Sequence, residues 1–190
     1  MFGVSFTNMP DRRANKSPAA LRSRLARVRL FLCDVDGVLT NGNVLIGGNL
    51  EVKEFNILDG FGLRLLQHEG IKVGWVSHRP SAATEQRAKE LKVDFLEQQS
   101  ANKVELVESI LQRAGMGWDE VCFVGDDLVD LGVLKRAGFS VVVANGIDEA
   151  KSVAHYVTKA KGGEGAVREV AVLILKAQKK WEQVIEQYFA

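Results

Sequence analysis

Two aspartates separated by a single valine follow the first strongly apolar stretch of the chain. Residues 30–40 read LFLCDVDGVLT, so Asp34 and Asp36 come directly after four residues whose burial is favourable. Two carboxylates this close repel each other, and a nearby cation would relieve the repulsion. One carboxylate can attack an electrophile while the other moves a proton. The stretch therefore favours nucleophilic catalysis with a cation at the same place.

Polar side chains with compatible chemistry follow two further apolar stretches, residues 71–77 and 120–124. If these stretches are parallel strands, their carboxyl ends meet at one edge of the sheet, where open sheets bind ligands. A lysine that opens the preceding helical stretch would join them there. The residues that we expect to gather with Asp34 and Asp36 are Ser77, His78, Arg79, Lys103, Gly125, Asp126, Asp127 and Asp130.

This set of side chains predicts a magnesium-dependent phosphoryl transfer. Carboxylate oxygens such as those of Asp34 and Asp126 are ligands that Mg²⁺ prefers. Lys103 and Ser77 supply the positive charge and the hydrogen-bond donor that phosphoryl oxygens need. Asp34 would attack phosphorus to form an aspartyl-phosphate, and Asp36 would protonate the leaving alcohol and later activate water.

Each motif taken alone also has an ordinary structural explanation. The Asp-Val-Asp-Gly at 34–37 can be a turn. The Gly-Asp-Asp-x-x-Asp at 125–130 can be a loop followed by a helix cap. Lys103 by itself is typical of a surface lysine. Their common position beside the ends of strand-like stretches favours one shared site.

The elements that must position these residues alternate between strand-like and helical patterns, which is typical of βαβ units. We expect strands at residues 30–35, 71–77, 93–95, 120–124, 139–143 and 155–157. We expect an N-terminal helix within 18–29 and further helices at about 60–69, 81–91, 102–114, 128–137, 147–153 and 166–188. Right-handed crossovers then give a three-layer, Rossmann-like α/β fold around a parallel sheet.

Residues 41–55 (NGNVLIGGNLEVKEF) interrupt this alternation. Two short apolar arms flank Gly47-Gly48-Asn49, which indicates a β-hairpin insertion. The rest of the chain offers no repeat or linker, and 190 residues suffice for one buried core rather than two. We predict a flexible basic leader at residues 1–16 and a single domain at 17–190.

The composition, 46% hydrophobic and 26% charged, is that of a globular protein. No apolar stretch approaches the roughly 18 to 20 residues of a membrane span, and no signal-peptide pattern opens the chain, so we expect a cytoplasmic protein without membrane contact. Residues 18–29 are basic but favour a helix with a solvated face over a nucleic-acid contact. Cys33 and Cys122 lie in strand-like stretches, which suits small buried side chains.

The chain resembles the haloacid dehalogenase superfamily of phosphotransferases in four motifs. These are Asp34-x-Asp36-Gly-Val-Leu-Thr40, Ser77 at the end of the second predicted strand, Lys103, and Gly125-Asp126-Asp127-x-x-Asp130. The resemblance implies a Mg²⁺-dependent phosphatase with Asp34 as nucleophile and Asp36 as general acid and base. It further implies a metal held by Asp34, Asp126 and the Asp36 backbone carbonyl, a phosphoryl group held by Ser77 and Lys103, and supporting roles for Thr40, Asp127 and Asp130.

Longer motifs resemble the 3-deoxy-D-manno-octulosonate 8-phosphate phosphatase family, over nearly all of residues 28–180. They are Asn41-Gly42 with the hairpin, Phe55-Asn56-x-x-Asp59-Gly60-x-Gly62, and Gly162-Gly163-x-Gly165-Ala166-Val167-Arg168-Glu169. The resemblance implies a cytoplasmic homotetramer of Gram-negative bacteria that releases phosphate from an eight-carbon keto-sugar acid on the way to lipopolysaccharide. The substrate contacts that it implies are Asp36, Asn56, Asp59, Gly60, Arg64, Arg79, Arg87 and Lys103.

The spacing between the motifs leaves no room for the cap domain that many superfamily members insert. Residues 36–71 accommodate only the hairpin and one helix, and residues 77–103 only a helix and a short strand. A site without a cap is open to solvent, so we expect a neighbouring subunit to cover it. The apolar hairpin arms are too short to be stable alone and favour packing against their copies; the alternative is a hairpin folded onto its own domain.

Two positions depart from the family pattern and bear on which sugar is preferred. His78 stands where the family usually has a glycine, and it is either a contact to the phosphate or leaving group or an exposed loop residue. Glu164 lies where some relatives have arginine, so an anion contact from that loop is in doubt.

Three other functions compete with this interpretation. A sibling phosphatase would act on a nine-carbon keto-deoxy sugar acid phosphate of the nononate type with the same chemistry. A non-catalytic oligomerisation domain, as found fused to CMP-sialate synthetases, would lack the motif acids that are present here. A phosphomutase is disfavoured because such enzymes generally need a cap to hold their intermediate.

Overall fold

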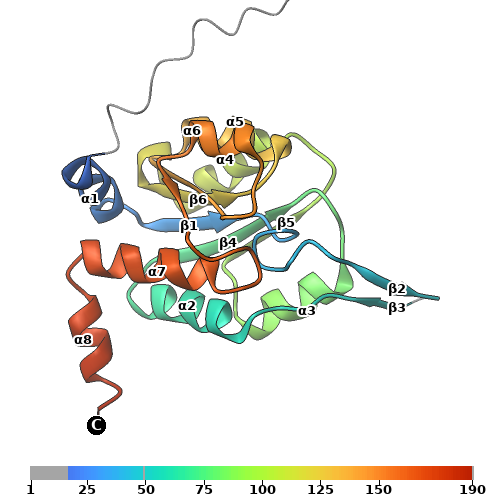
Figure 1. Ribbon diagram of the computed structural model, residues 1–190, viewed down its shortest axis with the longest axis horizontal. Helices are drawn as coiled ribbons and strands as arrows, with labels where there is room; N and C mark the ends of the chain where they lie inside the picture. The colour runs from blue at the N-terminus through green and yellow to red at the C-terminus, as the bar shows by residue number, and fades with distance from the viewer. Residues whose placement is uncertain (1–16, 49, 190) are drawn as a thin grey trace, which may run out of the picture.

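The computed structural model describes residues 17–189 except residue 49, so the predicted leader at 1–16 lies outside the described residues. A six-stranded sheet runs through its centre in the order β5-β4-β1-β6-β7-β8, and every neighbouring pair is parallel (Figure 1). Its strands are β1 (Leu30–Cys33), β4 (Lys72–Ser77), β5 (Phe95–Gln98), β6 (Val121–Gly125), β7 (Phe139–Val142) and β8 (Tyr156–Val157).

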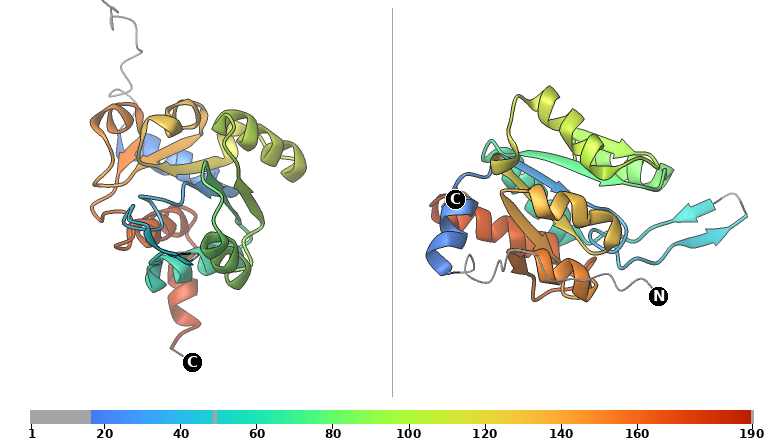
Figure 2. Two further views of the ribbon diagram at one scale, coloured as in Figure 1. Left: turned by 90° about the vertical axis from the view of Figure 1, so that its right-hand side faces the viewer. Right: turned by 90° about the horizontal axis from the view of Figure 1, so that it is seen from above.

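Helices cover both faces of this sheet and give three layers. In Figures 1 and 2, α2, α3 and α7 lie on one face, and α4, α5 and α6 lie on the other. The helices are α1 (Pro18–Ala26), α2 (Ile57–His68), α3 (Ala82–Glu90), α4 (Lys103–Ala114), α5 (Leu131–Arg136), α6 (Asp148–Val153), α7 (Ala166–Ala177) and α8 (Trp181–Glu186).

The central strand β1 is buried on both faces, which explains why its sequence is apolar without alternation. Phe31 and Cys33 pack into the core beneath α2 and α7, and Leu30 and Leu32 pack into the core beneath α4 and α5. The thiols of Cys33 and of Cys122 are free and buried, as predicted.

The strand order reverses at β1, because the chain first adds β4 and β5 on one side and then returns to place β6 on the other. The crevice beyond the carboxyl ends of β1 and β6 is therefore the switch point, where ligands bind in open α/β sheets. Asp34 directly follows β1, and Asp126 directly follows β6. The fold itself thus brings together the first and last predicted motifs.

The predicted hairpin is formed by β2 (Leu45–Gly47) and β3 (Leu50–Val52), which pair antiparallel with Leu45 opposite Val52. It extends away from the sheet rather than folding back onto it (Figure 2). Leu45 and Ile46 are 68% and 73% exposed, so the arms carry large apolar side chains into solvent.

The prediction of one helix at 166–188 is wrong, because the chain leaves the helical path between α7 and α8. Lys179 adopts a positive φ of 59°, and the amide of Lys180 donates to the carbonyl oxygen of Leu175. This is the helix-ending arrangement that usually contains glycine, so the sequence carried no signal for it. The Gln178 side chain fixes the break by donating to the Val28 carbonyl at 2.8 Å.

Other boundaries differ by a few residues from those predicted. β1 ends at Cys33, β5 occupies 95–98 instead of 93–95, and the helix predicted from residue 128 starts with a 3₁₀ turn at Leu128–Asp130. α2 starts at Ile57 rather than 60 because the Asn56 side chain caps it.

The three-layer α/β prediction is confirmed, and in the described part of the chain the hairpin is the sole insertion between β1 and α2, with no cap domain. Among these same residues, no helix combines the length and the apolar character needed to cross a membrane.

Candidate active site

The loop after β1 presents Asp34 and Asp36 on either side of the buried Val35. The amide of Asp34 still donates to Val124 of β6, at 3.0 Å, and the chain then turns back so that the amides of Leu39 and Thr40 donate to the Val35 carbonyl. The buried Thr40 hydroxyl accepts from the amides of Gly37 and Gly42, so it holds this turn. Thr40 therefore supports the loop that carries both acids.

Lys103 joins the first motif to the last one. Its ammonium lies 2.7 Å from Asp34 Oδ2 and 2.7 Å from Asp130 Oδ1, and its side chain is about as buried as theirs. The second oxygen of Asp130 accepts from the amides of Asp126 and Asp127, at 2.9 and 3.3 Å. Asp130, predicted as a supporting residue, thus contacts Lys103 directly and shapes the loop after β6.

Three carboxylates meet at the switch point. Oxygen atoms of Asp34, Asp126 and Asp130 all lie within 4.8 Å of one another. Burial raises the pKa of Asp34 to about 6, against the opposing effect of Lys103. Burial, reinforced by the neighbouring acids, raises the pKa of Asp126 to about 7. Such crowding of buried anions is unfavourable unless a cation shares the site.

The donor set fits Mg²⁺. Asp126 Oδ1 is buried and has no hydrogen-bond partner among the described residues, and carboxylate oxygens are hard ligands of the kind this ion takes. Gly37 leaves the space for Asp126, because a Cβ atom there would lie 2.1 Å from Asp126 Oδ2. Asp127 differs, since it is exposed and its side chain accepts from the Leu128 amide instead.

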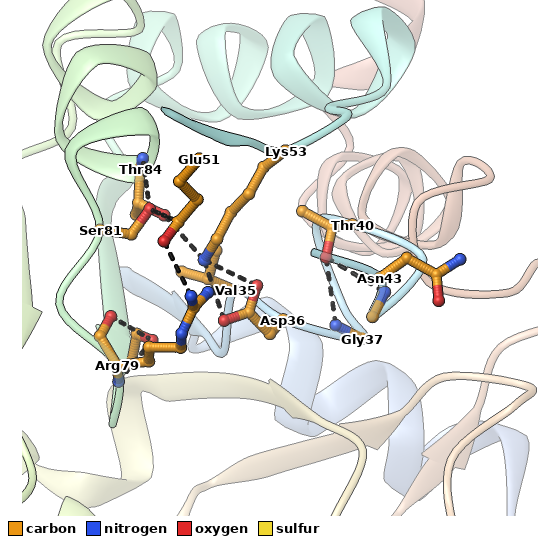
Figure 3. A network of polar contacts seen from close by, with 12 residues as sticks. Val35, Asp36, Gly37, Thr40, Asn43, Glu51, Lys53, Arg79, Ser81 and Thr84 are labelled. Carbon is orange, nitrogen blue, oxygen red and sulfur yellow. Dashed lines mark hydrogen bonds and ion pairs between the residues drawn. The ribbon is translucent and has the colours of Figure 1, made fainter. Parts of the chain in front are cut away.

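Asp36 is held by a residue that the sequence did not single out. Lys53, just beyond β3, places its ammonium 2.7 Å from Asp36 Oδ1 and 2.9 Å from Oδ2 (Figure 3). The Lys53 side chain is fully buried, whereas that of Asp36 is 25% exposed. The one available signal was weak: Lys53 follows an alternating strand, where a lysine is usually solvated.

The hairpin contacts the segment that follows β4 through Glu51, which binds both Arg79 and Ser81. The Ser77 hydroxyl accepts from the Arg79 amide at 3.1 Å, and the Arg79 guanidinium pairs with Glu51 of β3 at 2.8 Å. Glu51 also accepts from the Ser81 hydroxyl, which caps α3 (Figure 3). His78 is half-buried, and its Nε2 has no hydrogen-bond partner among the described residues.

Asn56 and Asp59 connect α2 to the glycine-rich loop at 162–165. Asn56 donates to the Gly163 carbonyl at 3.2 Å, and Asp59 accepts from the amides of Arg168 and Gly165. Gly162 of that loop lies against the Asp34 loop so closely that a Cβ atom would sit 1.7 Å from the Gly37 carbonyl oxygen. Within one chain, these residues therefore pack against the loop that carries Asp34 and Asp36.

The remaining predicted substrate residues lie along α2 and α3. Gly60 leaves room for Arg87, whose guanidinium pairs with Glu90. Arg64 donates to the Leu91 carbonyl and lines a hollow with Lys72, where β4 begins. Because Asp34 and Asp126 lie where the strands end, Arg64 is at the opposite edge of the sheet from these acids of its own chain.

Comparisons with known proteins agree with this geometry. The profile of haloacid dehalogenase-like hydrolases matches residues 94–170. The chain is 41% identical to the 3-deoxy-D-manno-octulosonate 8-phosphate phosphatase KdsC of Yersinia pestis, over 84% of this chain and 86% of that one. It is 37% identical to KdsC of Escherichia coli BL21, over 87% and 88%. The chain belongs to the 3-deoxy-D-manno-octulosonate 8-phosphate phosphatase family.

Solved structures of this family have the same fold. The phosphatase of Moraxella catarrhalis, crystallised with magnesium, phosphate and KDO, superposes with a TM-score of 0.88 at 34% identity and covers 90% of this chain and 99% of its own. The Yersinia pestis enzyme gives a TM-score of 0.84 at 40% identity, over 85% and 88%. Membership in the family makes this protein a phosphoric monoester hydrolase of the haloacid dehalogenase type.

Proposed function

We propose that this protein hydrolyses 3-deoxy-D-manno-octulosonate 8-phosphate to the free sugar acid and phosphate through an aspartyl-phosphate. The observation that carries the proposal is the Lys103 ammonium held between Asp34 and Asp130 at the switch point, beside an Asp126 oxygen that has no hydrogen-bond partner in the described part of the chain. Relatives of this identity and coverage carry the same activity in their names.

The chain's own residues can perform both halves of the reaction. An Asp34 oxygen forms a bond to phosphorus as the bond to the sugar oxygen breaks, and Asp36 gives its proton to that leaving oxygen. Water then attacks the aspartyl-phosphate while Asp36 takes up the proton, which restores Asp34 and releases phosphate. Lys103 and Ser77 hold the phosphoryl oxygens. Bound Mg²⁺, held by Asp34, Asp126 and the Asp36 carbonyl, would offset the negative charge of that group.

We assign the specificity for a sugar acid to the cationic and polar side chains that surround Asp34 and Asp36. Arg79 Nη1 has no hydrogen-bond partner among the described residues, so it suits the substrate carboxylate. Asn56, Asp59, Gly60 and Arg87 remain predicted contacts. Arg64, which lies at the opposite edge of the sheet, would contact substrate only in the site of another subunit.

We also propose a cytoplasmic homotetramer in which neighbouring subunits cover one another's sites. Its support is the projecting hairpin with exposed Leu45 and Ile46, together with the exposed Ile57 and Leu58 at the start of α2. Apolar side chains this exposed favour a protein interface.

Phosphate release from a panel of sugar phosphates, with Mg²⁺ or with a chelator, tests the proposal. The eight-carbon substrate should be hydrolysed with the highest kcat/KM and only with Mg²⁺. A higher kcat/KM for the nine-carbon nononate 9-phosphate would instead establish the sibling activity, and the absence of turnover on every keto-sugar acid phosphate would refute both.

A further inference from the structure

The two motif aspartates each face a buried lysine, and only one of these lysines belongs to the established motifs. Lys103 lies beside Asp34, whereas Lys53 lies beside Asp36 and contacts both of its carboxylate oxygens. The Lys53 ammonium also donates to the Thr84 hydroxyl of α3 at 3.3 Å. In the described part of the chain, Asp36 and Thr84 are the two residues that accept hydrogen bonds from this ammonium (Figure 3).

Burial of this ammonium has a specific physical requirement. The side chain of Lys53 has no exposed surface, and taking a charge out of water costs several kcal/mol unless a counter-charge with good geometry offsets it. Asp36 supplies that counter-charge, and the Thr84 hydroxyl accepts a further hydrogen bond from the ammonium. Lys53 therefore restrains the rotation of the Asp36 carboxylate while leaving the exposed quarter of that side chain free to meet a substrate.

The position of Lys53 in the chain links this restraint to the hairpin. Residues two apart in an extended strand point to the same side, and Glu51 and Lys53 both face the catalytic edge (Figure 3). Glu51 holds Arg79 and Ser81, and Lys53 holds Asp36 and Thr84. The return arm of the hairpin thus contacts both the loop after β1 and the start of α3.

We propose that Lys53 is a positioning residue, which orients the Asp36 carboxyl group for proton transfer to the leaving oxygen. This inference rests on the proposed function, in which Asp36 is the general acid. Lys53 itself transfers no proton. Its ammonium fixes the orientation of the Asp36 side chain and pairs with the carboxylate that remains after the proton has gone to the leaving oxygen, which is the ion pair seen in the structure.

Leaving-group dependence separates this role from a merely structural one. A sugar alkoxide needs the proton of Asp36 as it departs, whereas p-nitrophenolate departs readily without one. For Lys53→Met, kcat/KM for 3-deoxy-D-manno-octulosonate 8-phosphate should fall by about 30-fold or more. General acid catalysis typically contributes about 10²- to 10⁴-fold to the rate, and misorientation of Asp36 would remove part of this contribution. The fall for p-nitrophenyl phosphate should stay within about threefold. Equal falls for both substrates, or none, would overturn the proposal.

Two accompanying variants keep the result interpretable. Thr84→Val retains the lysine and the side-chain shape but removes one acceptor, so the ratio of the two kcat/KM values should shift in the same direction by about fivefold. If Lys53→Met does not fold, the ratio of the two kcat/KM values in Thr84→Val tests the positioning role by itself. An unchanged ratio in that variant refutes the role. Lys89→Met, which removes an exposed lysine of α3, should leave the ratio unchanged.

The Mg²⁺-induced rise in Tm should persist in Lys53→Met, because Asp34 and Asp126 are unchanged. Loss of this rise would show that the defect lies in the metal site and would overturn the positioning role.

The proposed substrate and the proposed role of Lys53 can fail separately. If the wild-type enzyme prefers another alkyl sugar phosphate, the proposed substrate is wrong, and the same ratio measured with that phosphate still tests Lys53.

Discussion

The ammonium of Lys103 lies 2.7 Å from Asp34 Oδ2, and both side chains are almost completely buried. Replacement by the apolar Lys103→Met leaves Asp34 and Asp130 facing each other without their shared cation. We expect kcat to fall by about 10²-fold or more, since a preorganised cation at the transferring group is lost. The free energy of unfolding at pH 8 should fall by about 3 kcal/mol because a buried ion pair is broken. Phosphate release and urea unfolding measure the two effects, with the exposed Lys89→Met as the matched control.

Asp34→Asn should separate catalysis from folding. An amide cannot form the aspartyl-phosphate, so turnover should fall at least about 10³-fold. Since burial raises the pKa of Asp34 to about 6, its ionisation opposes folding above that pH, and the neutral amide removes this penalty. The Tm of the metal-free variant at pH 8 should therefore equal or exceed that of the wild type. Turnover within tenfold of wild type would exclude Asp34 as the nucleophile.

The raised pKa values of Asp34 and Asp126 predict how pH governs the response to Mg²⁺. An acid with a raised folded-state pKa favours folding while protonated, and this contribution is lost as the pH rises through the folded pKa. The stability of the metal-free protein should therefore decline from about pH 4 and level off above about pH 7. Mg²⁺ binds the ionised acids, so it should raise Tm more at pH 8 than at pH 5.

Thermal unfolding with EDTA or Mg²⁺ at the two pH values makes this measurement. Asp126→Asn should abolish most of the difference between them, whereas Asp127→Asn, in which an exposed side chain changes, should retain it. A Mg²⁺-induced shift that is equal at pH 5 and pH 8 would contradict the assignment of these acids to the metal.

Gly162→Ala should damage the site without changing any charged residue. A Cβ atom there would collide with the carbonyl of Gly37, which lies in the loop that carries Asp34 and Asp36. We expect a loss of between about 1 and 3 kcal/mol in the free energy of unfolding, as for other overpacked positions, together with a fall in kcat. Gly47→Ala is the matched control because a Cβ atom at Gly47 meets no atom of the described residues within 4 Å. Similar stability of the two variants would show that the Gly162 loop moves freely.

The hairpin prediction concerns assembly. Leu45→Glu with Ile46→Glu places two charges on exposed arms, where they leave the folded subunit intact but oppose burial between subunits. Sedimentation at micromolar concentration should report about four subunits for the wild type and one or two for the variant. An unaltered tetramer would exclude the hairpin from the interface, and a monomeric wild type would refute shared coverage.

Much of the fold and the centre of the site could be predicted because their signals are local. Buried parallel strands require continuous apolar stretches, and polar residues directly after β1, β4 and β6 are brought together by the rule that these strand ends share one edge. The glycine pair at 47–48 is also a local signal, because a tight hairpin turn requires a backbone conformation with positive φ, which Gly48 adopts.

The features that sequence reasoning missed depend on distant contacts. The buried Lys53 ammonium is stabilised by Asp36 and Thr84, which are distant from it in the sequence. The residues next to Lys53 therefore give no signal of its burial. Lys179 ends α7 in a conformation that glycine normally signals, while the bond from Gln178 to Val28 joins residues far apart in the sequence. The resemblance also could not reveal that Arg64 lies at the opposite edge of the sheet from Asp34, because a matching motif does not show where along the helix a side chain makes its contacts.

The close approach of Gly162 to Gly37 also has a consequence for protein synthesis. The ribosome releases residues 34–37 early. The loop that packs against them, and the Arg168 amide that donates a hydrogen bond to Asp59, emerge only after most of the chain has been translated. A nascent chain therefore exposes both aspartates long before they can be held in register. Stalled or proteolysed products that end before residue 162 should accordingly contain Asp34, Asp36, Asp126 and Asp130 and still be inactive.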